Sequence, residues 1–421
     1  MAAMIPESAG ACSFAFVAFG RFVGWMVGWS LIAEYIFTSS AVSIAWSAYV
    51  VGLLKQLNIE FPASFASSPF EYNDVTSFTA TGTIFNLPAV LLVFLSAGIV
   101  MVGSREFSFT TAVILSIKVA TLVLFVLFGM GFINTANWDP FVPPSETFGR
   151  FGWSGVLRAS GLTTFAFIGF DAVATAAKES VNPVHDMPLA MFSTIGVCMV
   201  LYCSVALVLT GLVSYTKLVE PDPLVVAAME AGPGFHWMVP LIQVAVAVGL
   251  PSVVVVGLFA MSRILTVMAQ DGFLPRGLGE LHPSTGTPLV GTLLCALASA
   301  TLAALCPVEV IAELASVGTI LAFIVVCGAV ISMRSSHPDL PRPFAVPHLA
   351  IPVIGILLGL VVIAFLPWIT WARFVCWMLA GAALFAAQAA LGGNGYQTLP
   401  DGGGGGGTSL GGTGGTGAPG G

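Results

Sequence analysis

Long apolar segments recur along this 421-residue chain, and charged residues are rare within them. Hydrophobic residues make up 57% of the sequence and charged residues only 8%, too few to cover the surface of a soluble globular protein. A helix of about 20 apolar residues crosses the hydrocarbon core of a bilayer. A transmembrane barrel would show alternating strands of about ten residues, which this sequence lacks. The sequence therefore predicts an all-α, polytopic integral membrane protein.

Hydropathy and length predict about ten membrane-spanning helices. Their approximate bounds are 14–54, 86–103, 109–133, 156–177, 188–213, 236–268, 288–306, 309–333, 348–367 and 371–391. The first is long enough to be either one continuous helix or a broken one. From residue 392 onward the sequence is dominated by glycine, so residues 392–421 are expected to form a disordered tail.

Lysine and arginine are divided unevenly between the two sets of connections. One side receives Arg21, Arg105, Lys178, Arg263, Arg276, Arg334 and Arg342, and the other receives Lys55, Arg150, Arg158, Lys217 and Arg373. Because positive residues favour the cytoplasmic side, the first set and the glycine-rich tail are predicted to be cytoplasmic.

Several classes of function have no support in the sequence. The seven cysteines lie singly in apolar surroundings, without CxxC motifs, and are read as small core residues. The net charge of −7 suggests no nucleic-acid partner. The five histidines lack the spacing of a helical metal site, and no phosphate-binding glycine loop or GxSxG motif is present. We therefore expect no enzyme activity and no cofactor. The first residues also lack the pattern of a signal peptide.

Three ionisable residues fall well inside predicted spans: Glu34, Lys118 and Asp171. A charge in hydrocarbon costs at least a few kcal/mol, so each needs a partner, a cavity or a broken helix beside it. Each is therefore a functional candidate. A structural alternative for Glu34 is a packing carboxyl held by hydroxyls such as those of Ser30 or Thr38. For Lys118 the alternatives are snorkelling to the interface or a static link between helices.

Asp171 follows Gly169 in the stretch FAFIGFDAVATAAKE. Glycine in the middle of a span is a common site of helix interruption, where freed carbonyls and amides can bind a ligand. Asp171 is expected to cap the half-helix that follows the interruption, with direct ligand contact as the alternative. The pattern thus directs attention to the main chain just before Asp171.

The sequence resembles the cationic amino acid transporters of the amino acid-polyamine-organocation superfamily. The similar segments are GWSLIAEYIFTSSAVSIAWS, GSREFSFTTAVILSIKV, FAFIGFDAVATAAKESVNPVHDMPLA, SRILTVMAQDGFLP, ELASVGTILAF and RPFAVP, and they are spread over nearly the whole hydrophobic chain. The resemblance implies a fold of two inverted five-helix repeats, with substrate held where the first helix of each repeat is broken. The first repeat would be partial, over about 14–133, the second would cover about 156–333, and two further helices would follow over about 348–391.

The same resemblance implies roles for individual residues. Phe165, Ala166 and Ile168 would line the substrate site with Gly169 and Phe170, and Phe165 would gate it. Glu34 would be the family's glutamate near the pocket. Lys118 would replace the cation that sodium-coupled relatives bind, which favours coupling to protons or to membrane potential.

The start of the chain departs from the family. The stretch MIPESAGACSF resembles the cytoplasmic end of the family's second helix, so the chain is expected to lack family helix one and most of helix two. Family helix one carries the glycine-rich break that holds the substrate carboxylate. Three interpretations remain open. The chain could be a fragment of a transporter, an isoform or paralogue without transport, or part of a split protein that another chain completes.

The resulting functional hypothesis is an amino acid permease, for cationic amino acids such as arginine or lysine, that works by alternating access around the break at Phe165–Asp171. Its expected partners are the amino acid substrate and the lipid bilayer, and protons are the candidate coupling ion. The expected location is a plasma or vacuolar membrane. The alternative is a membrane sensor or assembly subunit that keeps the fold and binds ligand without moving solute.

Overall fold

The computed structural model describes residues 10–74, 77–103, 107–169, 173, 180, 182–218, 222–283, 285–336 and 348–390. These residues are mainly α-helical, as predicted. The strands among them form one antiparallel hairpin, β1 (Phe70–Asp74) paired with β2 (Ser77–Ala80). The predicted glycine-rich tail lies outside the described residues.

The bundle is built from helices of very different length. They are α1 (Ala11–Phe19), α2 (Arg21–Gln56), α3 (Leu87–Val102), α4 (Phe107–Gly129), α5 (Gly152–Thr163), α7 (Pro183–Leu212), α8 (Pro223–Glu230), α9 (Met238–Gln270), α10 (Leu289–Leu305), α11 (Val308–Ser336), α12 (Ala350–Ala364) and α13 (Trp368–Ala390). Short 3-10 turns connect them: η1 (Ala63–Phe65), η2 (Met130–Phe132), η3 (Thr135–Trp138), η4 (Thr164–Phe167), η6 (Tyr215–Lys217) and η7 (Arg276–Leu278).

Six of the described helices are long and apolar enough to cross a membrane: α2, α4, α7, α9, α11 and α13. Three more, α3, α10 and α12, are apolar but have only 16, 17 and 15 residues. Helix α5 stops after 12 residues, although it was expected to continue to residue 177. The predicted spans therefore correspond to six long helices, three shorter ones and one segment whose helix ends early.

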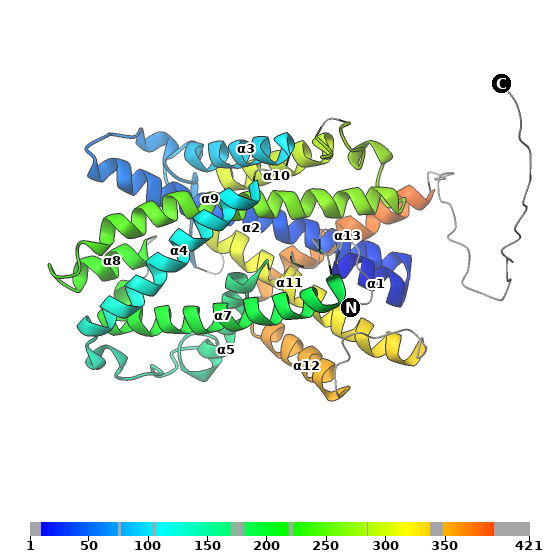
Figure 1. Ribbon diagram of the computed structural model, residues 1–421. Helices are drawn as coiled ribbons and strands as arrows, with labels where there is room; N and C mark the ends of the chain where they lie inside the picture. The colour runs from blue at the N-terminus through cyan, green and yellow to red at the C-terminus, as the bar shows by residue number, and fades with distance from the viewer. Residues whose placement is uncertain are drawn as a thin grey trace, which may run out of the picture.

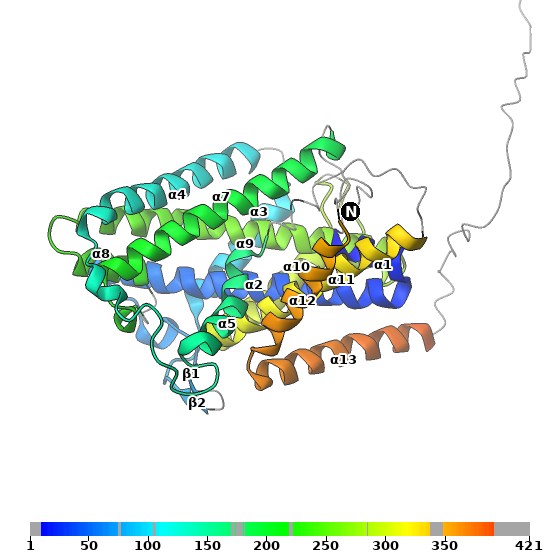
Figure 2. The same cartoon turned by 90° about the horizontal axis from the view of Figure 1, so that it is seen from below.

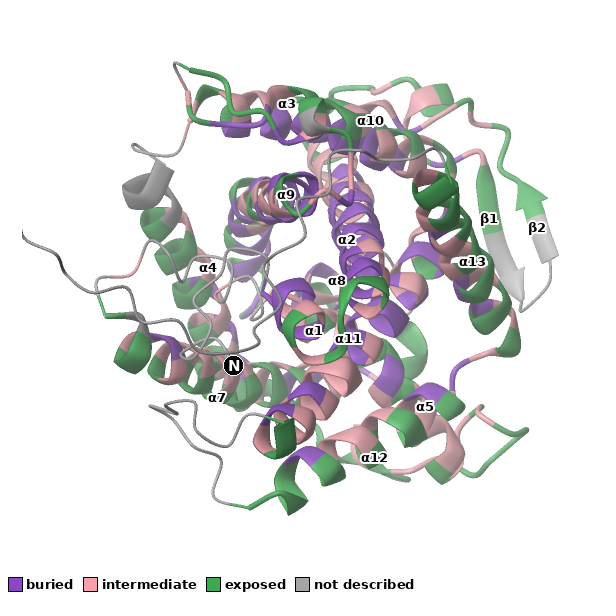
Figure 3. Cartoon of the chain, turned by 90° about the vertical axis from the view of Figure 1, so that its right-hand side faces the viewer, coloured by how far each residue is buried: buried purple, intermediate pink, exposed green. Residues whose placement is uncertain are grey.

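The long helices run side by side, as Figures 1 and 2 show from two directions. Seen along the bundle in Figure 3, α2, α9 and α11 occupy the middle, where the buried residues gather. One continuous apolar cluster joins α1, α2, α3, α9, α10 and α11, and we call it the central core. Helices α4, α7, α8 and α9 share a second apolar cluster, around Phe125, Phe235 and Met238.

Local sequence signals explain where several helices begin. The predicted segment 14–54 is broken into α1 and α2 at Gly20, whose φ of 84° is accessible to glycine but costly for other residues. The Asn86 side chain caps α3 by accepting the Ala89 N–H at 3.1 Å. Helix α7 starts at Pro183, whose missing N–H costs nothing in a first turn.

Helix α13 is tied to α2 by tryptophans. The Trp29 indole N–H donates to the Trp377 carbonyl at 2.9 Å, and the Trp377 indole N–H donates to the Trp29 carbonyl at 3.3 Å. Their rings stack with centroids 4.7 Å apart. One turn away, the Trp25 indole N–H donates to the Gly381 carbonyl at 2.8 Å. Three hydrogen bonds between residues about 350 positions apart therefore fix the last described helix against the centre of the bundle.

Candidate functional site

The helix of α5 is interrupted where the glycine predicted it. Regular α-helix ends at Thr163, and one 3-10 turn, η4, carries the chain to Phe167. Ile168 is then extended, with φ −60° and ψ 133°, and Gly169 has a φ of 113°. Such an interruption removes the regular i to i−4 hydrogen bonds and leaves main-chain groups available for other partners. Regular helix thus ends before Asp171, as expected, and the half-helix predicted to follow lies outside the described residues.

The residues of this break lie at the edge of the central core. The side chains of Phe165 and Ile168 are half-buried and pack against that core, while Ala166 is exposed. The Phe167 ring makes an edge-on contact with Tyr202 of α7, with centroids 5.4 Å apart. The turn η4 itself packs against α11. Phe170 and Asp171, the other two residues predicted here, lie outside the described residues.

Glu34 lies in the middle of α2 and is completely buried. Its helix meets α11 at a close approach, because a Cβ added to Gly318 would lie 3.3 Å from Ser30 Oγ and 3.8 Å from Glu34 Cβ. The Ser30 hydroxyl donates to the Gly318 carbonyl at 3.4 Å. The Ser30 hydroxyl thus donates to α11 rather than to the Glu34 carboxyl, and a packing carboxyl held by other hydroxyls such as that of Thr38 stays a prediction. Helix α11 is the element that both Glu34 and the break contact.

Lys118 reaches from α4 to the part of α9 that contains Pro251. Its Nζ donates to the Gly249 carbonyl at 3.4 Å, and its side chain runs across the glycine, since a Cβ there would lie 2.6 Å from Lys118 Cγ and Cδ. Ser252 Oγ donates to the same carbonyl at 2.7 Å. Pro251 lies within α9 and cannot donate to the carbonyl of Ala247. That carbonyl accepts instead from the Trp46 indole N–H of α2, at 2.8 Å.

A small cavity ends at Lys118. Its volume is about 170 Å³, and α4, α8 and α9 line it with Lys118, Thr121 and otherwise apolar side chains such as Leu224, Ile242 and Leu250. A water needs two to four polar partners, so such an apolar space favours staying dry. The half-buried Lys118 thus lies between this apolar cavity and the Gly249 carbonyl of α9.

Sequence reasoning missed a second buried carboxyl, that of Glu313. It is only 7% exposed, on α11, and accepts a hydrogen bond from the Thr370 hydroxyl of α13 at 2.5 Å. Glu313 is four residues from the predicted start of its span, where a charged residue is ordinary at a membrane surface. The signal that was missed is the stretch ELASVG, in which Glu313 is followed closely by small residues. Small residues in a span are typical of a close contact between helices.

Comparisons with known proteins agree on one kind of protein. The sequence profile of the family described as "Amino acid permease" matches residues 1–391. The branched-chain amino acid permease of Bacillus subtilis is 33% identical over 385 residues, which cover 91% of this chain and 80% of that protein. The methylthioribose transporter of the same organism is 34% identical over 382 residues, 90% of this chain and 79% of the relative.

Plant proteins match less closely. The vacuolar cationic amino acid transporter 4 of Arabidopsis thaliana is 29% identical over 339 residues, which cover 80% of this chain and 54% of that protein. The relatives are therefore named for different transported solutes.

Proposed function

The chain belongs to the amino acid permease family, and we propose that it moves an amino acid across a membrane by alternating access around the break that follows α5. It is an integral, multi-pass membrane protein. The observation that carries the proposal is the interrupted helix beside the central core, since an interruption at that depth is stable only where it contacts protein or lines a cavity. A plasma or vacuolar membrane is the proposed location.

The main chain of the break would receive the substrate amino group. An ammonium group donates up to three hydrogen bonds, and the carbonyls of Phe165, Ala166 and Ile168 no longer belong to a regular α-helix. The Phe165 carbonyl accepts the Ile168 N–H at 3.2 Å and would use its second lone pair for the substrate. Gly169 would provide the change of direction, and Phe165 would cover the bound substrate. Phe170 is proposed to line the same site and Asp171 to cap the half-helix that follows.

The substrate class that we place first is the aliphatic amino acids. The described side chains at the break, Phe165, Ala166 and Ile168, are apolar and offer no partner to a charged side chain. The expectation of arginine or lysine came from the family resemblance, and Glu34, the carboxyl that could serve such a side chain, is completely buried against α11. The name of the bacterial branched-chain relative agrees with this ranking. Cationic amino acids remain the second candidate, because the plant relatives are named for them and Glu34 is the one buried carboxyl on α2 among the described residues.

Lys118 is proposed to be the coupling residue. Its ammonium group bridges α4 to α9 at the Gly249 carbonyl, two residues before Pro251. A fixed positive charge there would replace a bound metal cation, so transport would be coupled to protons or to membrane potential.

Uptake into proteoliposomes tests the proposal. Radiolabelled leucine should accumulate and unlabelled leucine should compete, with arginine measured in parallel. Phe165→Ala should raise the half-saturating leucine concentration about tenfold, the consequence of losing an apolar wall worth one to two kcal/mol. Phe94→Ala is the matched control, because Phe94 is an exposed phenylalanine of α3 away from the break.

Three results would decide among the alternatives. Arginine uptake that Glu34→Gln abolishes, without leucine uptake, would favour the cationic class. Saturable binding without any flux would favour a sensor or assembly subunit. Unchanged uptake in Phe165→Ala would refute a substrate site at the break.

A further inference from the structure

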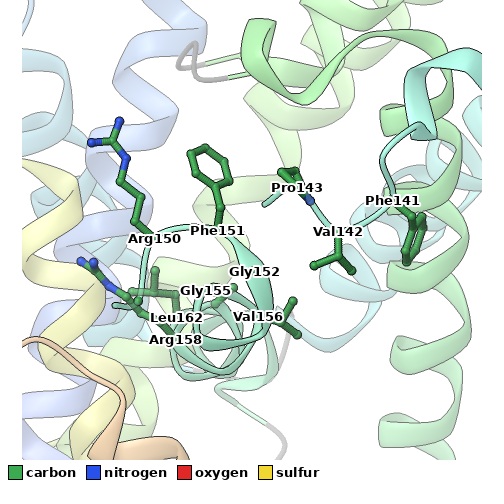
Figure 4. A pocket seen from close by; sticks show the side chains of 12 residues that line it. Phe141, Val142, Pro143, Arg150, Phe151, Gly152, Gly155, Val156, Arg158 and Leu162 are labelled. Carbon is green, nitrogen blue, oxygen red and sulfur yellow. The ribbon is translucent and has the colours of Figure 1, made fainter. Parts of the chain in front are cut away.

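A second cavity lies at the start of α5, outside the break. Its volume is about 400 Å³, within the range of about 300–1,000 Å³ that is usual for small-molecule pockets. The loop before α5 and the first three turns of that helix line it (Figure 4). Its walls are mainly apolar and include Phe141, Val142, Val156 and Leu162, and two arginines, Arg150 and Arg158, complete it.

The loop that forms one wall is held by its own main chain. The Gly152 N–H donates to the Pro143 carbonyl at 2.9 Å, and the Glu146 N–H donates to the Arg150 carbonyl at 3.2 Å. The Ser154 hydroxyl accepts the Gly149 N–H at 3.1 Å and so joins the loop to the first turn of α5. The cavity is therefore formed by ordered backbone.

The two arginines differ in what they already bind. Arg150 pairs with Glu146 at 3.1 Å, and both side chains are more than half exposed. Such a surface pair is worth about 0–1 kcal/mol and exchanges readily with water or ligand. Arg158 is half-buried and makes no hydrogen bond or ion pair with any residue that the structure describes. Its aliphatic stem lies along the loop, since a Cβ at Gly149 would be 3.3 Å from Arg158 Cδ.

The polar and apolar parts of the site are separated in space. In Figure 4 the side chains of Arg150 and Arg158 extend to the left, with their guanidinium ends directed away from Phe141 and Val142, which lie on the right. A guanidinium without a partner matches a carboxylate, which it can bind through two parallel hydrogen bonds. The apolar side chains of the lining suit an aliphatic body. The chemistry that fits both features is a small molecule with one oxyanion group and an apolar side chain.

The cavity extends to the last turn of α5, just before the break. Arg158 and Leu162 are spaced i and i+4 within α5, so both lie on one face of that helix. Phe165 follows three residues after Leu162, in the 3-10 turn η4 that comes after the end of α5 at Thr163. Leu162 lines the cavity and is 37% exposed, between the two positions.

We propose that this cavity is a first binding site for the amino acid, in which Arg158 binds the substrate carboxylate and the apolar wall receives the side chain before the molecule moves to the break. The inference rests on the proposed function, because it takes the ligand to be the transported solute. An anionic lipid headgroup offers a similar oxyanion, and the experiment separates the two sources.

The direct test uses 4-methylpentanoate, which has the carboxylate and side chain of leucine but no amino group. Isothermal titration of the full chain in neutral phosphatidylcholine nanodiscs should show binding. Arg158→Gln should weaken this binding at least about tenfold, as expected for losing a charge-assisted hydrogen bond, and Arg158→Lys should restore part of it. Lys217→Gln is the matched control. It also removes one positive charge, but Lys217 is paired with Glu230 and does not line the cavity.

Transport gives an independent readout. Arg158→Gln should raise the half-saturating leucine concentration at least about fivefold and leave the maximal rate within about twofold, because saturating substrate bypasses a capture step. Leucinamide, which lacks the carboxylate, should be insensitive to the substitution.

The outcomes are distinguishable. Arg158-dependent binding of 4-methylpentanoate by a protein that transports no amino acid would support the cavity and refute the proposed function. Leucine transport with equal half-saturation in wild type and Arg158→Gln would refute the cavity and leave transport intact. Loss of 4-methylpentanoate binding when phosphatidylglycerol is added to the nanodiscs would identify a lipid headgroup as the occupant and overturn the proposal.

Discussion

The Trp46 indole of α2 donates a hydrogen bond to the Ala247 carbonyl of α9, and this is the carbonyl that Pro251 leaves without its helical donor. The tryptophan thus replaces a hydrogen bond that the sequence of α9 removes. The exchange permits a proline inside α9, close to Lys118, without leaving the Ala247 carbonyl unsatisfied.

A double-mutant cycle tests this replacement. Trp46→Phe should lower the free energy of unfolding by about 1–3 kcal/mol, because the Ala247 carbonyl is then left without a donor. In a Pro251→Ala background the residue at 251 again has an N–H, so Trp46→Phe should cost much less. The measurement is the unfolding midpoint in detergent for all four proteins. Additive losses would show that Trp46 contributes by packing alone.

Gly249→Ala should displace Lys118. The added methyl group would lie 2.6 Å from two carbons of the lysine side chain, so the ammonium group must leave the Gly249 carbonyl. We expect a loss of proton-driven uptake of about tenfold or more with little change in the amount of folded protein. Gly196→Ala on α7 is the control, because no atom lies within 4 Å of the added group. Normal coupled uptake by Gly249→Ala would remove Lys118 from the coupling mechanism.

Part of this arrangement could be predicted from sequence. The spans and the interruption near Gly169 depend on local composition and on one glycine, so sequence reasoning located them. Pairings such as Trp46 with Ala247 join residues 201 positions apart, and nothing in a single sequence indicates which carbonyl a distant indole will reach.

The site residues also divide into those that local sequence indicates and those that only contacts between distant segments reveal. Glu34, Lys118 and the break were predicted as candidates because charge and glycine are unusual in apolar spans. Glu313 was missed because its partner, Thr370, lies on another helix 57 residues away. Arg158 was counted only as a loop charge, since its cavity depends on how residues 141–152 fold back over α5.

Gly381→Ala should separate α13 from α2. A Cβ at this position would overlap the Trp29 ring, and the Gly381 carbonyl accepts from Trp25. Overpacking of this kind typically costs about 1–3 kcal/mol. We expect a lower melting temperature than for Gly98→Ala on α3, where the added methyl meets open space. Equal melting temperatures would contradict the close packing of α13 on Trp29.

Thr370→Val should destabilise the contact between α11 and α13. Valine keeps the shape of threonine but removes the hydroxyl that donates to Glu313, which leaves a buried carboxyl with one donor fewer. The expected loss is about 1–3 kcal/mol, read from the unfolding midpoint in detergent. Combining Thr370→Val with Glu313→Leu should recover much of the loss, because both polar groups are then absent. A double variant less stable than Thr370→Val would assign Glu313 further partners.

The reciprocal bonds between Trp29 and Trp377 have a consequence for motion. Two groups that each donate to the other's backbone cannot slide by a fraction of a helical turn without losing both bonds at once, and the stacked rings resist rotation. We therefore expect helices α2 and α13 to move together as one unit. If the chain alternates between two shapes, the boundary of that rearrangement runs elsewhere, on the side of the bundle where α5 and η4 meet α11.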